Sequence, residues 1–454
     1  MVEQPVEVEE EAAESRWSAP GVGYLRRLLG YANKVYALGA VLERVHDGRQ
    51  RPQIPMSTVV RAVFACGLFR VRSFNALEPQ LAEPQLVHAL GLGNGRQPPR
   101  RVCSVDTLVR ALRRANPESF HDMLSALSKR AERNKVFREG WIGALRYAAL
   151  DGWEPIASRH HHCAQCLERQ IHDGRQLVTE YYHRYVVALL LGAHEEVVLG
   201  FEPIRNAWAR RQAGETQADG DEGEQTAAIR LVRRLRTTYG RWIEVIVADS
   251  LYPNGPFLTV CAELGLGAVI VAKKETDEPL RDALAIWGHR PGQVVIDTEA
   301  RERLELWDCP DCQTLTTYAG PIRVVRGVVE SVAAPGTPRR QWCMLVIGKV
   351  TQRLSPRQIL RVARGRWHLE NTGFNQWTQH WHFEHVFTTD GTAIAAIFAL
   401  FFLAFNVLQL FVYRQLKSYG RLRGKDPTHT IVRVVDILLA DLHRLAEPLC
   451  WDSS

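Results

Sequence analysis

The chain has 454 residues, 46% of them hydrophobic and 24% charged, which is a globular composition that excludes a fibrous or wholly disordered protein and allows two or three domains. The formal net charge is +7, and the lysines and arginines gather in short runs, a pattern that suits a phosphate-binding protein and also an ordinary solvated surface. Nine cysteines in a long chain whose first residues are acidic argue against a secretory signal, so we expect a protein of the reducing cytoplasm.

The first third of the chain is predicted to be helical after a disordered arm. Residues 1–20 are rich in glutamate and poor in aromatic residues, which is typical of disorder. Residues 21–139 contain an apolar run at 59–69 and, from the capping residue Ser104 onward, a helical pattern rich in arginine. Short helices of this kind suit a domain that reads the DNA major groove, and they equally suit any small helical domain.

After Gly140 the pattern changes to short strands and helices. Five runs of β-forming residues lie at 144–150, 185–191, 197–201, 243–248 and 268–272. Helical patterns precede the fourth and the fifth run. Three strands followed by alternating helices and strands predict an α/β fold, with residues 140–290 as the first part of its core.

A block of strands interrupts this core. In residues 291–352 the helical signal vanishes, and β-forming runs lie at 294–297, 304–307, 314–318, 322–329 and 342–347. We interpret the block as an inserted antiparallel β domain. Residues 353–415 are then the second part of the core, and residues 416–454 are a helical C-terminal tail.

An apolar segment at residues 393–413 is just long enough to span a bilayer. Asn406 and Gln409 interrupt it, and it directly follows a polar helix. We therefore predict a buried core helix and no membrane association.

Glu370 lies in a predicted helix with clear start signals. Ser355 can cap the helix, Pro356 suits its first position, and Gln358 completes a capping box. The apolar stripe of this helix comprises Ile359, Leu360, Val362, Ala363, Trp367, Phe374, Trp377 and Trp381. Glu370 falls on that stripe, where a carboxylate requires a positive partner. The partner is either Arg366, one turn earlier, or a bound cation.

Two aspartates follow hydrophobic strands. Asp151 follows the run at 144–150, and Asp249 follows the run at 243–248. Ligands of open α/β sheets bind outside the carboxyl ends of strands, so both acids are predicted to face that crevice, although such aspartates are also common in turns. Together with Glu370 they supply oxygen ligands for a pair of Mg²⁺ or Mn²⁺ ions, which would offset the repulsion among the carboxylates.

These features resemble, in this order, the DDE transposases of bacterial insertion sequences. The matching features are the strand before Asp151 and Gly152, the strand before Asp249, the block of strands, the stretch from Arg366 to Asn371 and the apolar helix with Asn406. They extend over about residues 100–415. The resemblance is to the group whose RNase H-like core carries a β insertion before the glutamate, and it implies that Asp151, Asp249 and Glu370 bind the catalytic metals.

The resemblance also implies a reaction and its partners. The reaction is metal-dependent DNA strand cleavage and strand transfer by in-line attack on phosphodiesters. The partners are the terminal inverted repeats of the element, target DNA at the nucleoid and a second copy of the chain in the synaptic complex. The alternative is a catalytically retired, transposase-derived protein that only binds DNA.

Several residues are predicted to contact DNA. The family signature places an arginine at Arg366, and we add the neighbouring Asn371 and the basic pair Arg233 and Arg234. The tyrosine and lysine of the signature are replaced here by Ala363 and Trp377. A lysine or arginine elsewhere could take over their DNA-phosphate contacts, and their loss is also what motivates the retired-protein alternative.

Three tryptophans in or beside the block of strands are further candidates. Trp287, Trp307 and Trp342 could each stack on a base displaced at the element end, with core packing as the alternative.

Two cysteine pairs have the spacing of a zinc knuckle, Cys163 with Cys166 and Cys309 with Cys312. Brought together, they would form a closed tetrahedral Zn²⁺ site that joins the insertion to the loop after the first strand. Unrelated free thiols are the alternative.

Overall fold

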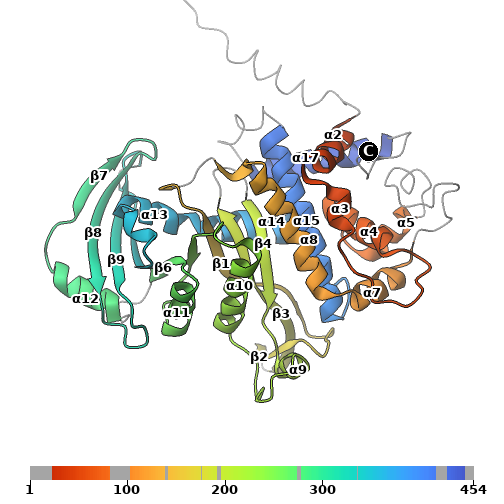
Figure 1. Cartoon of the computed structure of the whole chain (residues 1–454), viewed down its shortest axis with the longest axis horizontal. Helices are drawn as coiled ribbons and strands as arrows, with labels where there is room; N and C mark the ends of the chain where they lie inside the picture. The colour runs from red at the N-terminus through yellow and green to blue at the C-terminus, as the bar shows by residue number, and fades with distance from the viewer. Residues whose placement is uncertain are drawn as a thin grey trace, which may run out of the picture.

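One sheet extends from one end of the molecule to its middle, and most helices gather at the other end, where the N-terminal helices lie beyond the sheet (Figure 1). The computed structural model describes residues 23–81, 103–138, 142–174, 176–191, 196–272, 278–334, 336–415 and 427–444. The predicted arm of residues 1–20 lies outside the described residues. Mixed helices and strands agree with the predicted α/β class.

The strands of the sheet are β1 (Tyr147–Ser158), β2 (Leu167–Asp173), β3 (Gln176–Leu191), β4 (Glu196–Pro203), β5 (Val245–Ala248), β6 (Gly267–Ala272), β7 (Gln293–Asp297), β8 (Glu302–Cys312), β9 (Ile322–Ser331) and β10 (Arg340–Ile347). Their order is β2-β3-β1-β5-β6-β10-β9-β8-β7, with β4 also paired to β3. β1, β5 and β6 are parallel, and the other pairs are antiparallel.

The helices before the sheet are α2 (Tyr24–Tyr36), α3 (Leu38–Leu42), α4 (Met56–Leu68), α5 (Phe74–Gln80), α7 (Val105–Arg114) and α8 (Pro117–Arg133). Those between strands are α9 (Ala207–Gln212), α10 (Glu224–Tyr239), α11 (Gly255–Glu263) and α12 (Glu278–Trp287). After the sheet come α13 (Pro356–Gly365), the π-helical turn η3 (Leu369–Phe374), α14 (Asn375–Trp381), α15 (Gly391–Gln415) and α17 (Pro427–Arg444).

The part of the sheet that the first core prediction covers has the order β4-β3-β1-β5-β6. β5 and β6 are buried along their whole length, as strands covered by helices on both faces should be. Helices α10 and α11 precede them and provide the crossovers that parallel neighbours need. The parallel pairing sets the end of β5 level with the middle of β1, which continues to Ser158.

The predicted β insertion is not a separate sheet. β10 pairs with β6 over five residue pairs, from Cys343 opposite Ala272 to Ile347 opposite Ala268, so the strands of 293–347 continue the core sheet. The physical reason is that β6 is wholly apolar and its second edge would otherwise lie unpaired. The strand predicted at 314–318 does not form, because this segment turns across the start of α11, where a Cβ on Gly255 would lie 2.0 Å from the carbonyl oxygen of Thr317.

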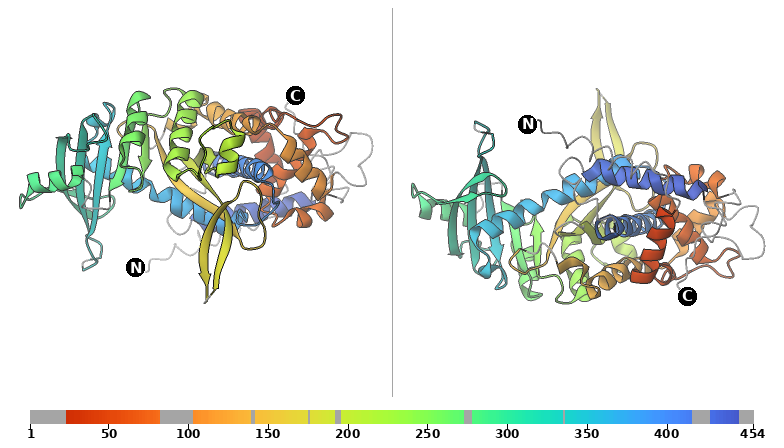
Figure 2. Two further views of the ribbon diagram at one scale, coloured as in Figure 1. Left: turned by 90° about the horizontal axis from the view of Figure 1, so that it is seen from below. Right: turned by 90° about the horizontal axis from the view of Figure 1, so that it is seen from above.

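The N-terminal helices share their core with α15 (Figures 1 and 2). Helices α4, α7 and α8 and strand β4 all pack against α15. α4 approaches it so closely that a Cβ on Gly67 would lie 2.7 Å from the Phe401 ring. The predicted boundary at residue 139 is therefore not a boundary of packing.

The C-terminal tail also returns to this bundle. α17 packs against α2, and the Asp441 carboxylate accepts hydrogen bonds from the first N–H groups of α2, with Tyr24 N at 2.6 Å. A carboxylate at this position caps the helix and complements its dipole.

The apolar segment forms the buried core helix that the sequence predicts. α15 is long and apolar enough to cross a membrane, yet 94% of its most apolar window is buried inside the protein. Asn406 fits this interior because Oδ1 accepts from Val198 N at 2.8 Å and Nδ2 donates to Val198 O at 2.9 Å. The amide thus pairs with the edge of β4 that faces away from β3.

Replacing Asn406 with leucine is expected to lower the free energy of unfolding by about 2 kcal/mol or more, because two buried backbone groups lose their partner. The control is Gln409→Leu in the same helix. Within the described residues, neither polar side-chain atom of Gln409 has a hydrogen-bond partner. Its replacement should leave stability unchanged or raise it. Urea denaturation followed by circular dichroism checks both, and equal losses would refute the role of Asn406.

Candidate active site

The two aspartates lie side by side on neighbouring parallel strands. Asp151 belongs to β1, and Asp249 directly follows β5. The pairing sets Tyr147 opposite Val245, so Asp151 and Asp249, equally far along their strands, stand at the same level. Because side chains alternate along a strand, both acids point to the face on which Tyr147 and Val245 pack against α13. Glu370 follows α13, the helix that packs on this face.

Glu370 lies where the predicted helix changes its winding. α13 begins with the capping box of Ser355 and Gln358, as predicted. The helix is not continuous, however, because residues 369–374 wind as a π-helix before α14 begins. Such turns are frequent at functional sites because they shift the faces of a helix. Trp367, which helical spacing places on the buried stripe, is instead 48% exposed.

Arg366 joins two of the three acids. Its Nη1 donates to Asp151 Oδ2 at 2.6 Å and to Glu370 Oε1 at 2.7 Å. The Arg366 side chain is only 5% exposed, and that of Asp151 13%. Of the two partners that the sequence left open for Glu370, Arg366 or a bound cation, the structure shows the contact with Arg366, and the contact of Arg366 with Asp151 was not predicted. One buried cation therefore holds carboxylates from β1 and from η3 next to each other.

The three acids also interact electrostatically. Burial raises the pKa of Asp151 to about 7; the Arg366 guanidinium acts against this, and the charges of Asp249 and Glu370 add to it. Asp151 and Glu370 share the Arg366 guanidinium, and with Asp249 nearby the group carries an excess of negative charge in a partly buried space. Carboxylate oxygens are the donors that Mg²⁺ and Mn²⁺ prefer, so the residues present fit a divalent metal site.

The side chain of Trp153 packs β1 against the helices that follow Arg366. It follows Asp151 by two residues on β1, and its ring stacks on Phe374 of η3 with centroids 6.1 Å apart. Its ring also meets Trp377 of α14 at 5.2 Å and Phe402 of α15 at 5.6 Å. The strand of one acid and the helix of another are thereby packed through one aromatic cluster, which fixes their distance.

Arg366 thus joins Asp151 of β1 to Glu370 of η3, and Asp249 follows the neighbouring strand β5. Residues 215–407 match the family model of the transposase DDE domain. The match includes Asp249, Arg366 and Glu370 and supports a DDE transposase, a family that generally uses a divalent metal. Asp151 precedes the matched residues and joins the site through the pairing of β1 with β5. No curated protein matches the chain.

A fourth carboxylate borders the three acids, and sequence reasoning assigned it no role. Glu224, in the first turn of α10, accepts a hydrogen bond from Tyr252 Oη at 2.7 Å and contacts Arg184 Nη2 at 2.6 Å. A Cβ on Gly152 would lie 2.1 Å from its Oε2. The glycine after Asp151 is thus required so that Glu224 can pack against β1.

The residues predicted to bind DNA differ in their surroundings. Asn371 and Arg233 are exposed, and DNA contact by them stays a prediction. Arg234 instead forms ion pairs with Glu202 of β4 and Glu118 of α8, which tie α10 to both elements. Its guanidinium has this structural role within the fold, and DNA contact by Arg234 also stays a prediction.

The two signature positions that depart from the family are core positions here. Ala363 and Trp377 are both fully buried, so neither can contact DNA in this structure. Ala363 packs against the sheet, and Trp377 packs against Phe402 of α15.

The three candidate tryptophans differ in burial and in the side chains that they contact. Trp287 is 7% exposed and packs in the core, and the Arg326 guanidinium covers the ring of Trp307 at 4.7 Å. Trp342 instead meets the exposed Trp367, with ring centroids 6.3 Å apart. Both rings line a cavity of about 760 Å³ that reaches Arg366 and Glu370. The structure therefore places one of the three beside the acids.

The two cysteine pairs do not meet. Cys163 and Cys166 lie beside β3, whereas Cys309 and Cys312 lie on β8, toward the other end of the sheet. The shared four-cysteine zinc site is therefore wrong, because five strands separate β3 from β8 in the sheet order. Hydrogen bonds from the Cys166 thiol and from His183 lower the pKa of Cys163 to about 4. His183 had no sequence signal, since it lies far from the knuckle along the chain.

Proposed function

We propose that the chain is a metal-dependent DNA transposase that cleaves and joins the strands of an insertion sequence. The observation that carries this proposal is the meeting of Asp151 and Glu370 on one Arg366 guanidinium, beside Asp249 at the same level of the next strand. The order β4-β3-β1-β5-β6, with helices before the last two strands, supports an RNase H-like core. The strands of 293–347 correspond to the insertion of that family, here as an extension of the sheet.

Asp151, Asp249 and Glu370 would hold the metal, Mg²⁺ or Mn²⁺ and in this family a pair of ions. When bound, such a pair stabilises both the attacking and the leaving oxygen of an in-line displacement on phosphorus. The side chains of the chain orient this reaction: Trp153 sets the distance between β1 and η3, and Glu224 supports the strand beneath Asp151.

Arg366 has two tasks in this proposal. Before metal is bound, its guanidinium offsets the charge of Asp151 and Glu370. Once other cations take over that role, the guanidinium is free to bind a DNA phosphate, for which its planar fork is well suited. The arginine of the family signature thus keeps a function in a site that lacks the signature tyrosine and lysine.

The cavity beside the acids is the proposed site for a displaced base. Trp342 and Trp367 offer two aromatic faces, and the exposed Arg340 lines the same cavity. Base stacking on aromatic side chains tolerates any sequence, and a nearby arginine attracts the backbone phosphate. Trp307 and Trp287 are less suited because they are engaged in packing.

Replacing Trp342 or Trp367 with alanine is expected to weaken binding of DNA with one unpaired, displaced base by about tenfold, because each base–aromatic stack contributes about 1–3 kcal/mol. Binding of fully paired DNA should change much less. The control is Trp208→Ala, an exposed tryptophan on α9, a helix that lies far from α13 in Figure 1. Fluorescence anisotropy with both probes measures the difference, and an equal effect of Trp208→Ala on the displaced-base probe would refute this site.

The function is tested with the DNA that flanks the gene. A plasmid carrying both flanks is incubated with the purified chain and Mg²⁺ or Mn²⁺. Nicks at the boundaries of an inverted repeat and joining of the released ends to a second plasmid are expected, and chelation with EDTA should stop both. Binding without any nick in either metal would instead support the second candidate.

That second candidate is a retired DNA-binding protein. It is favoured by the buried Arg366, which stands between the acids, and by Ala363 and Trp377 at signature positions. Intact inverted repeats with short flanking duplications of the target favour an active element, and their absence favours the retired protein.

A further inference from the structure

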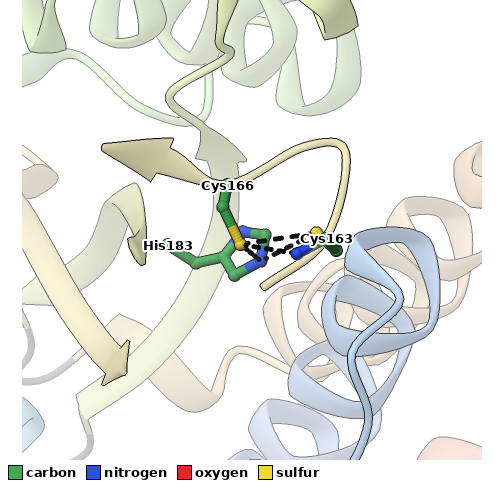
Figure 3. A group of neighbouring side chains, drawn as sticks. All are labelled: Cys163, Cys166 and His183. Carbon is green, nitrogen blue, oxygen red and sulfur yellow. Dashed lines mark hydrogen bonds between the residues drawn. The ribbon is translucent and has the colours of Figure 1, made fainter. Parts of the chain in front are cut away.

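Two cysteines and one histidine form a compact group away from the three acids. Cys163 lies in the loop after β1, Cys166 directly precedes β2, and His183 lies in the middle of β3 (Figure 3). Their donor atoms are all within 4.8 Å of one another. Cys166 and His183 are buried, and Cys163 is half-buried.

The distances match the edges of a metal tetrahedron. The two Sγ atoms are 3.6 Å apart, and His183 Nε2 is 3.4 Å from each of them. With Zn–S near 2.3 Å and Zn–N near 2.0–2.1 Å, tetrahedral angles place two sulfurs about 3.8 Å apart and a sulfur and a nitrogen about 3.6 Å apart. The three atoms therefore surround one zinc-sized space with little adjustment.

The backbone of the loop is folded as a metal knuckle. Cys163 N donates to Cys166 Sγ at 3.2 Å, and Gln165 N donates to Cys163 Sγ at 3.3 Å. N–H groups that point at sulfur stabilise the thiolate form, which is the form that binds metal. A disulfide would need the sulfurs near 2.05 Å, and both cysteines are free.

Neighbouring elements hold the knuckle in place. Asn206, the cap of α9, donates to Ala164 O and to Cys166 O, both at 2.9 Å. Gln165 Nε2 donates to Thr392 Oγ1, in the first turn of α15, at 3.5 Å. The loop that follows the strand of Asp151 is thus fastened to β3, α9 and α15 around the three donors.

From this geometry we infer that Cys163, Cys166 and His183 bind a structural zinc ion, independently of the metal site at the three acids. Two thiolates and one imidazole are soft and borderline donors that select Zn²⁺ over Mg²⁺ or Mn²⁺. Solvent or the adjacent His162, whose ring stacks on Tyr181 of β3, completes the tetrahedron. This inference goes beyond the proposed transposase function and does not depend on it.

The zinc would stiffen the base of a projecting hairpin. Beyond His183, β2 and β3 leave the body of the protein as a two-stranded arm (Figure 2). A two-stranded hairpin is marginally stable by itself. A metal that bonds the start of β2 to the middle of β3 fixes the register and the direction of that arm.

The first test is the metal content of the full chain, purified without a histidine tag from zinc-supplemented cells. Elemental analysis is expected to find about one zinc per chain. Cys163→Ser and His183→Ala should each weaken zinc binding by at least about 100-fold, since even residues that only support a metal ligand contribute 10–100-fold. Wild-type protein without zinc would overturn the inference, as would a disulfide between Cys163 and Cys166.

Two control variants separate this site from others in the chain. Cys309→Ser combined with Cys312→Ser removes the second knuckle and should leave the zinc content unchanged, as should Asp151→Asn at the acids. Zinc lost from the double cysteine variant but kept by Cys163→Ser would overturn the assignment.

Cobalt substitution keeps the test decisive if Cys163→Ser fails to fold. Wild-type chain stripped of metal and loaded with Co²⁺ should show the ligand-field bands of tetrahedral cobalt and a thiolate-to-cobalt charge-transfer band. A spectrum typical of six oxygen ligands would contradict the site.

Discussion

Replacing Asp151 with asparagine, or Glu370 with glutamine, is expected to lower the rate of DNA strand cleavage and joining by at least about 1,000-fold while DNA binding survives. Each change removes a charge that would hold the metal but keeps the shape of the side chain. The fold should persist, because Arg366 retains one carboxylate partner in either variant. Cleavage is measured on end-labelled DNA and binding by gel shift.

The matched control for the aspartate is Asp173→Asn. Asp173 is the last residue of β2 and forms an exposed ion pair with Arg159 on the β2–β3 arm, whereas Asp151 lies within β1. If Asp151 had only a structural role in its strand, Asp151→Asn would behave like Asp173→Asn. Undiminished cleavage by Asp151→Asn or by Glu370→Gln would eliminate the proposed chemistry.

Replacing Arg366 with glutamine is expected to have opposite effects on metal binding and on catalysis. Mn²⁺ should bind at least about tenfold more tightly in the absence of DNA, because a buried competing cation worth about 1.4 kcal/mol or more is removed. Strand cleavage should nevertheless fall by about 100-fold or more, since the guanidinium no longer binds the DNA phosphate. Arg366 is thus expected to compete with metal for the carboxylates when DNA is absent and to bind the DNA phosphate during strand cleavage.

The metal affinity of Arg366→Gln is measured by calorimetry over a series of pH values. Burial raises the pKa of Asp151 and the Arg366 guanidinium acts against this, so the loss of the guanidinium would raise that pKa further and protons would compete with metal. Arg364→Gln is the control, because Arg364 lies on the same helix but pairs with Glu302 of β8. That variant should bind Mn²⁺ like the wild type. Weaker binding by Arg366→Gln would show that the arginine supports the metal site rather than competing with metal.

Local sequence signals predicted much of the site. The capping box of Ser355 and Gln358 is present as expected, and the hydrophobic strands before Asp151 and Asp249 are formed. These features depend on neighbouring residues only, so spacing and residue type were sufficient. The burial of α15 was also predictable, because Asn406 and Gln409 mark a helix inside a protein.

Long-range pairing was not predictable from such signals. β10 joins β6 because an apolar strand edge needs a partner, but no local pattern specifies which strand supplies it. The knuckle of Cys163 and Cys166 was visible, yet its partner His183 comes from the middle of a distant strand. The role of each basic residue was also not predictable from local sequence. Arg233 and Arg234 are neighbours in the chain, but of the two only Arg234 forms an ion pair with Glu202.

The helix around Glu370 shows how tertiary packing overrides periodicity. A regular helix would bury Trp367, whereas the observed chain exposes it and winds into a π-turn after Arg366. The Trp153 ring contacts Phe374 and Trp377 and so keeps both side chains buried. The additional residue of the wider π-helical turn then lies between Leu369 and Phe374, in the segment that contains Glu370. The departure from regular structure thus coincides with the proposed catalytic acid.

A crystal of the chain soaked in Mn²⁺, with anomalous diffraction recorded, measures the proposed site most directly. We expect manganese peaks bonded to oxygens of Asp151, Asp249 and Glu370 and the Arg366 guanidinium moved out from between the acids. Saturating Mn²⁺ that leaves Arg366 in contact with both Asp151 and Glu370, without a peak among the three carboxylates, would contradict a metal-dependent nuclease.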